Sequence, residues 1–98
     1  MYKPEFTKQA RKDATLIESA GLKNNVVKLI CIIRINPFQS PPPFEALKGD
    51  RKGAYSCRIN RQHRFVYEVL PNTENFKDDN GVLYQGIVKI IRMWTHYE

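Results

Sequence analysis

The chain is organised around the stretch AYSCRINRQHRFVY, residues 54–67. Apolar and polar side chains alternate along residues 55–60, as they do in a half-buried β-strand. After a polar turn, residues 64–70 predict a strand that returns antiparallel to the first. In such a hairpin Arg58 and Arg64 can lie on the same face. The opposite face carries the side chains expected in the core, which are Tyr55, Cys57, Ile59, Phe65, Tyr67 and Val69.

Two helices are predicted before this hairpin. Thr7 is a suitable N-cap and Gly21 a suitable residue after a C-terminus, which predicts a helix over residues 8–20. Apolar residues at helical spacing predict a second helix over residues 22–35, and Asn36-Pro37 ends it. The sequence thus places a helical pair directly ahead of the hairpin.

The remaining segments complete the order of elements. Residues 2–6 suit a short strand, and Pro4 confines that strand to an edge of the sheet or to a strand start. Residues 36–53 form a long connection that the three prolines 41–43 stiffen toward polyproline II geometry.

A polar loop over residues 71–81 leads into a last strand over residues 82–93. The order is strand-helix-helix-strand-strand-strand, which predicts an α+β fold with two helices packed on a small, mainly antiparallel, twisted sheet. We expect one domain over residues 1–98, because this length supports a single core.

The charge balance indicates a polyanionic partner. The 98 residues carry 16 Lys and Arg against 10 Asp and Glu, a formal net charge of +6. Such a surplus favours nucleic acid, although an acidic protein would serve equally well.

The cysteines and the N-terminus indicate the class of protein. Cys31 and Cys57 lie in apolar surroundings without a CxxC motif, which predicts two buried thiols and neither a disulfide nor a zinc site. The N-terminus has no apolar segment typical of a signal peptide, and the longest apolar run, residues 29–33, is too short to span a bilayer. We therefore expect a soluble, cytoplasmic protein with no membrane partner.

Four short motifs carry a family resemblance. They are EALKG at residues 45–49, YSCRIN at 55–60, HRFVY at 63–67 and WTHY at 94–97. Together, and in this order, they resemble the YoeB/Txe group of the RelE toxin superfamily, which implies a RelE-like fold for nearly the whole chain.

The resemblance implies the toxin of a type II toxin–antitoxin system. Such a toxin is an mRNA endoribonuclease that cuts in the ribosomal A site, surrounded by 16S and 23S rRNA, and thereby inhibits translation. The resemblance also implies a YefM/Phd-type antitoxin that covers the active surface, and operator DNA bound only through the antitoxin complex. The residues at the family's catalytic positions are Glu45, Arg64 and His96. The residues at positions that bind or orient RNA are Lys48, Arg58 and Tyr97.

The chain departs from the family pattern at three places. Ser56-Cys57-Arg58 stands where the family often has Ser-Arg-Arg, so the hairpin has one basic group fewer. The connection over residues 71–81 is longer than in most members, and Glu98 extends past the usual terminal tyrosine.

The proposed chemistry needs neither a metal nor a cofactor. RNA carries its own nucleophile, the 2′-hydroxyl, so an enzyme must only deprotonate it and protonate the leaving 5′-oxygen. Glu45 is the candidate base, His96 the candidate acid, and the planar fork of Arg64 suits the phosphorane oxygens. The products would be a 2′,3′-cyclic phosphate and a 5′-hydroxyl. We expect Arg64→Ala to cost more than the loss of either acid or base, since donors aimed at developing charge usually lower the barrier most.

Other interpretations remain open at this point. Glu45 could be a loop carboxylate paired with Lys48, and the two arginines could be a solvated strand face. The rival to the ribonuclease is a nonenzymatic RelE-like binding module, either a co-repressor that depends on its antitoxin or an inhibitor of another target. The nuclease hypothesis requires that residues 45, 64 and 96 converge around one phosphate.

Overall fold

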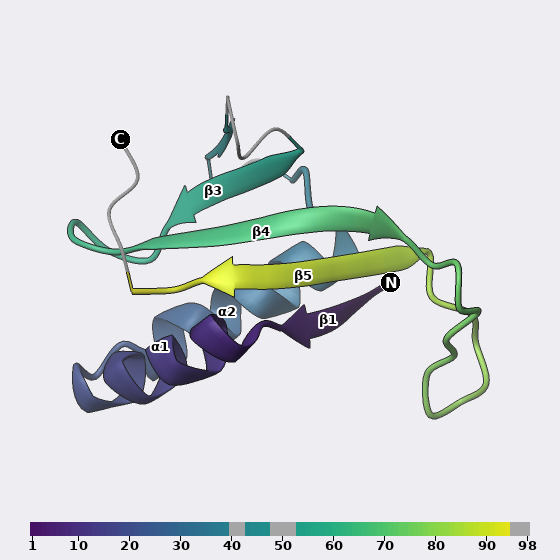
Figure 1. Ribbon diagram of the computed structural model, residues 1–98, viewed down its shortest axis with the longest axis horizontal. Helices are drawn as coiled ribbons and strands as arrows, with labels where there is room; N and C mark the ends of the chain where they lie inside the picture. Colours follow the sequence, from purple (N-terminus) through teal and green to yellow (C-terminus); the bar gives the residue numbers. More distant parts are fainter. Residues whose placement is uncertain (40–42, 48–52, 95–98) are drawn as a thin grey trace.

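The computed structural model describes residues 1–39, 43–47 and 53–94. It has the α+β architecture expected from the sequence, with two helices packed on a five-stranded mixed sheet (Figure 1). The elements are, in chain order, β1 (Tyr2–Phe6), α1 (Lys8–Ser19), α2 (Lys23–Ile35), β2 (Phe44–Ala46), β3 (Ala54–Arg58), β4 (Arg64–Pro71) and β5 (Gly86–Arg92).

The sheet has the strand order β1-β5-β4-β3-β2. β1 runs parallel to β5, and every other neighbouring pair is antiparallel. β1 is an edge strand, which confirms the position expected from Pro4, since an edge strand needs fewer backbone donors. The last strand of the chain, β5, lies between β1 and the β3–β4 hairpin, inside the sheet.

Local sequence signals set the helix ends. The Thr7 hydroxyl oxygen accepts a hydrogen bond from the Ala10 backbone N–H at 3.0 Å, which caps α1 as expected. After the helix, Gly21 adopts a φ of 75°, a left-handed conformation that glycine reaches without a Cβ penalty. α2 then ends at Ile35, directly before the Asn36-Pro37 pair.

The main core lies between the two helices and one face of the sheet. It contains Ala10 and Ile17 from α1, and Val26, Leu29 and Ile33 from α2. The sheet contributes Cys57, Ile59, Phe65, Tyr67, Val88 and Ile90, followed by Met93. The alternation predicted for the hairpin is therefore confirmed. Within the described residues, neither helix has the length and apolarity needed to cross a membrane.

The opposite face of the sheet has only a small apolar cluster. Ala54, Val66 and Ile91 are buried there, with Leu47 packed against them. A β-bulge between Val66 and Tyr67 shifts the register of β4 against β5. Beside this cluster, β2, β3 and β4 present the polar side chains of Glu45, Ser56, Arg58 and Arg64.

Two segments differ from the expectation. The long connection over residues 36–53 contains the strand β2, which exists because its backbone pairs with β3 and because Phe44 packs on Tyr55 with ring centroids 5.9 Å apart. β5 begins at Gly86 rather than at residue 82. Residues 72–85 form an ordered loop, in which the Asn72 side chain hydrogen-bonds the backbone of Phe76 and Tyr84.

The prediction of two buried thiols is wrong for one of them. Cys31 is exposed, because Val26, Leu29 and Ile33 define the buried face of α2 and Cys31 lies on another. Cys57 is buried as expected, and burial raises the pKa of its thiol to about 11. Cys57 belongs to the core between the helices and the sheet, so it lies on the face of β3 opposite to Arg58. It does not line the cavity beside Arg58 and Arg64.

Candidate functional site

The candidate site is built on the sheet face that points away from the helices. The register of β2 on β3 places Glu45 opposite Ser56. The register of β3 on β4 places Arg58 opposite Arg64. Strand pairing alone therefore brings a carboxylate, a hydroxyl and two guanidinium groups from three strands to one small area.

Arg64 occupies the centre of this area. Its Nε donates a hydrogen bond to the Ser56 Oγ at 3.1 Å, and its Nη2 lies 3.5 Å from the Glu45 Oε2. The Arg64 side chain is only 15% exposed, whereas the Glu45 side chain is 74% exposed. The guanidinium is thus largely enclosed, and the carboxylate beside it is open to solvent.

A cavity of about 360 Å³ opens at this point, lined by Pro43, Glu45, Arg58 and Arg64. Two like charges directly opposite each other on neighbouring strands destabilise a sheet. Arg58 and Arg64 adopt this arrangement, with the Glu45 carboxylate paired to Arg64 and lining the same cavity. Two planar forks of N–H donors suit the oxygens of a phosphate group. The described residues contain no group of three side chains placed to hold a metal ion.

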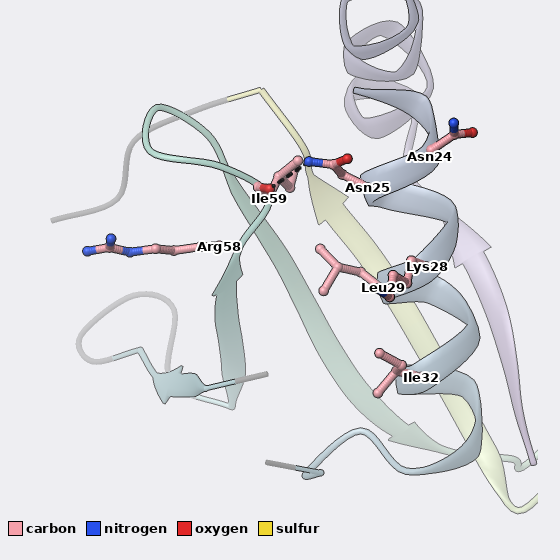
Figure 2. Close-up of a pocket in the computed structure, with 7 residues that line it drawn as sticks. All are labelled: Asn24, Asn25, Lys28, Leu29, Ile32, Arg58 and Ile59. Atoms are coloured by element: carbon pink, nitrogen blue, oxygen red, sulfur yellow. Dashed lines mark hydrogen bonds between the residues drawn. The ribbon is translucent and has the colours of Figure 1, made fainter. Parts of the chain in front are cut away.

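Arg58 also lines a second hollow, a groove of about 690 Å³ between α2 and the end of β3 (Figure 2). Leu29 and Ile32 project from α2 toward β3, while Arg58 extends away from the helix. The Asn25 Nδ2 donates to the Ile59 carbonyl oxygen at 3.2 Å and ties the helix to the strand end. Arg58 therefore borders both the groove and the cavity.

A buried carboxylate holds the end of β5. Asp13 of α1 is 1% exposed and its Oδ2 accepts hydrogen bonds from the Arg92 Nε and the Met93 N–H, both at 3.0 Å. Its Oδ1 accepts a third from the Gln9 Nε2 at 2.9 Å. Burial by itself would raise the pKa of Asp13, but the hydrogen bonds from Met93, Gln9 and Arg92, with the positive charge of Arg92, lower it below its ordinary value.

An aromatic stack lies next to the end of β5, at the residue that follows Met93. The rings of His63 and Trp94 are 3.8 Å apart between centroids and 18° from parallel. His63 belongs to the turn between β3 and β4, as expected, and that turn lies at the same end of the sheet as the end of β5 (Figure 1). Trp94 is half-buried and packs against the core. Asp13 and His63 together fix where the chain leaves β5.

The structure brings together Glu45, Arg58 and Arg64 of the residues expected to act on RNA. The other three, Lys48, His96 and Tyr97, lie outside the described residues. Sequence reasoning missed Ser56 and Asp13. The available signals were that Ser56 alternates onto the same strand face as Arg58, and that Asp13 lies among apolar residues on the buried face of α1.

Comparison with solved structures finds proteins of the same fold. The YoeB/ParE toxin from Agrobacterium tumefaciens is 27% identical with a TM-score of 0.78, over 97% of this chain and 99% of that one. YoeB in the YoeB–YefM complex from Staphylococcus aureus is 27% identical with a TM-score of 0.69, over 99% of each chain. YafQ from E. coli, at 18% identity and a TM-score of 0.62 over 98% and 94%, shares the fold.

A search of curated proteins found no match. The family model of the YoeB-like toxin of bacterial type II toxin–antitoxin systems matches residues 6–97, which is almost the whole chain. The order of elements and the solved relatives agree with this match. This chain therefore belongs to the family of YoeB-like toxins of bacterial type II toxin–antitoxin systems.

Proposed function

We propose that this chain is a metal-independent endoribonuclease that cuts mRNA in the ribosomal A site, in the cytoplasm, and so inhibits translation. The observation that carries the proposal is the contact between Glu45 and Arg64 at a cavity that Arg58 also lines. Membership of the YoeB-like toxin family supports it, because cleavage of mRNA would make this small basic domain toxic.

In this proposal Glu45 is the general base that takes the proton of the 2′-hydroxyl. Its carboxylate is 74% exposed, so an RNA strand can reach it without a change of fold. Arg64 donates to the nonbridging oxygens of the phosphorane, where preorganised donors contribute most to the rate. Arg58 and Lys48 add positive charge around the phosphate.

The general acid in this proposal is His96, which protonates the 5′-oxygen as it leaves, and Tyr97 orients the RNA beside it. These assignments rest on the motif WTHY at residues 94–97. The described part of the chain supports them to this extent: Asp13 and His63 hold the segment through Trp94, directly before these residues. His96 is only two residues beyond Trp94 in the sequence, so the fixed position of Trp94 limits the space that His96 can reach.

We propose a YefM/Phd-type antitoxin as the protein partner, since the relative from Staphylococcus aureus was solved in complex with YefM. The net charge of +6 suits such a partner if it is acidic, and also suits mRNA and the surrounding rRNA. Contact with operator DNA would occur only through the antitoxin complex.

Primer extension on a defined message, translated by purified ribosomes with and without the protein, tests this proposal. We expect cuts within translated codons that leave 2′,3′-cyclic phosphate ends, and none with Arg64→Ala. Arg11→Ala is the matched control, because Arg11 is an exposed arginine of α1 on another part of the molecule. Equal cutting by wild type and Arg64→Ala would contradict the proposed site.

Growth after induction separates the ribonuclease from a nonenzymatic binding module. The wild type should arrest growth, and both Arg64→Ala and His96→Ala should not. Arrest by both variants, with messages left intact, would favour a module that inhibits another target. No arrest by the wild type would favour a co-repressor that acts only with its antitoxin.

A further inference from the structure

We propose that Ser56 is a positioning residue that orients the guanidinium of Arg64 for phosphate binding. This inference rests on the proposed function, because it concerns the same site. Ser56 lies in the middle of β3, between Glu45 on one neighbouring strand and Val66 on the other. Its side chain points to the face that carries the cavity, yet the residue is only 1% exposed.

The Ser56 hydroxyl is buried and is paired with Arg64. A buried hydroxyl group is costly without a hydrogen bond, so its partner is part of the structure. The Ser56 Oγ accepts from the Arg64 Nε at 3.1 Å, within the normal range for such a bond. The bond joins β3 to β4 across the floor of the site.

Arg64 also contacts Glu45, and this contact is the longer of the two. The Glu45 Oε2 lies 3.5 Å from the Arg64 Nη2, which is longer than a good hydrogen bond, and the Glu45 side chain is 74% exposed. An ion pair with so exposed a carboxylate orients its members weakly. The hydrogen bond to Ser56 is therefore the stronger of the two restraints on the Arg64 plane.

The hydrogen bond to Ser56 fixes the plane of the Arg64 guanidinium group. A guanidinium carries five N–H donors in one plane, so fixing the direction of Nε also fixes the direction of both Nη groups. With Nε bound to Ser56, the Nη groups are left for the carboxylate and for a phosphate in the cavity. Without the acceptor, Arg64 would regain rotamer freedom and would have to be ordered again during each reaction.

Three variants of Ser56 test the inference, with kcat and KM measured for cleavage of a defined message on ribosomes. Ser56→Ala should lower kcat by about tenfold to a hundredfold and leave KM within about twofold, because it misplaces a donor that acts in the transition state. Ser56→Thr keeps the acceptor and should retain kcat within about threefold of wild type. Ser56→Cys keeps the size of the side chain but offers a weak acceptor, and should fall between the two.

The cysteine variant separates positioning from packing. If Ser56 only fills space, Ser56→Cys should match wild type, and that result would overturn the inference. Thermal unfolding of each variant shows whether the site has stayed folded. Should Ser56→Thr unfold because its methyl group does not fit, the comparison of Ser56→Cys with Ser56→Ala still decides.

A double-mutant cycle tests whether the effect passes through Arg64. In an Arg64→Lys background the fork and its Nε are absent, so Ser56→Ala should change kcat by less than about twofold. If the double variant instead shows the product of the two kcat losses measured for the single variants, the inference is wrong.

A measurement without RNA keeps the inference separate from the proposed function. In the NMR spectrum of the wild type, the Arg64 Nε–H should exchange slowly with water, and in Ser56→Ala it should exchange at least about tenfold faster. A wild type that never cuts RNA would defeat the proposed function, whereas unchanged exchange in Ser56→Ala would defeat the positioning role itself.

Discussion

Two carboxylate–arginine pairs in this molecule have opposite characters. Asp13 and Arg92 join α1 to the end of β5 at 3.0 Å, and the carboxylate is 1% exposed. Glu45 and Arg64 join β2 to β4 at 3.5 Å, and there the carboxylate is 74% exposed while the arginine is enclosed. In the first pair the acid is buried, and in the second it faces solvent.

This difference in burial indicates which pair contributes to the stability of the fold. Asp13 accepts three hydrogen bonds within the protein and is 1% exposed, so burial keeps it from a ligand in solution. Removing one partner of such a buried group leaves an uncompensated charge and costs several kcal/mol. The exposed pair contributes about 0–1 kcal/mol to stability, which leaves its groups available for a substrate.

Arg64→Ala should show the largest effect on activity. We expect kcat for mRNA cleavage to fall by about 10²–10³, because the substitution removes donors aimed at the phosphorane. The free energy of unfolding, measured by urea denaturation, should fall by about 1–2 kcal/mol, because the buried Ser56 hydroxyl loses its partner while the ion pair with Glu45 adds little. A loss of several kcal/mol would mean that this pair, like Asp13 and Arg92, supports the fold.

Asp13→Ala should show the converse. We expect the free energy of unfolding to fall by about 3 kcal/mol, since Arg92 and the Met93 N–H lose their buried acceptor. Urea denaturation measures this, with Glu18→Ala on the exposed side of the same helix as the control. A change as small as that of the control would remove the contrast between the two pairs.

Glu45→Gln should reduce activity less than Arg64→Ala. Loss of a general base typically costs about 10²-fold or more in kcat, and we expect a value near 10² because the arginines continue to bind the phosphate. Stability should stay within about 0.5 kcal/mol of wild type. The matched control is Glu74→Gln in the exposed loop before β5, and equal activity of both variants would exclude Glu45 as the base.

The smallest expected effect is the pH dependence of the Asp13 contribution. Because the pKa of Asp13 is lower in the folded protein than its ordinary value of 3.8, its ionisation stabilises the fold fully above that value. The contribution is lost as the pH falls through the folded-state pKa. The difference in unfolding free energy between wild type and Asp13→Asn should therefore be constant from about pH 5 to 7 and shrink toward about pH 2. A difference that grows on acidification would contradict the sign of the shift.

Much of the fold could be predicted from the sequence because its signals are local. Thr7 and Gly21 mark the ends of α1 through their own backbone and side-chain chemistry. The alternation along residues 54–67 requires a strand with one buried face, which also placed Arg58 and Arg64 together. β2 could not be predicted in this way because three residues carry no periodic signal, and it forms only by pairing with β3.

The amino-acid sequence by itself determined the order of the elements, the family, and the presence of a carboxylate and two arginines on or beside the hairpin. Side-chain type and periodicity act over a few residues, and they are sufficient for these conclusions. Only the tertiary structure decided which partners those groups have: Ser56 under Arg64, Asp13 at the end of β5, and Cys31 at the surface. Hydrogen bonds and burial between distant segments depend on the strand register and on the angle at which helices pack, and neither is written in any single stretch of the chain.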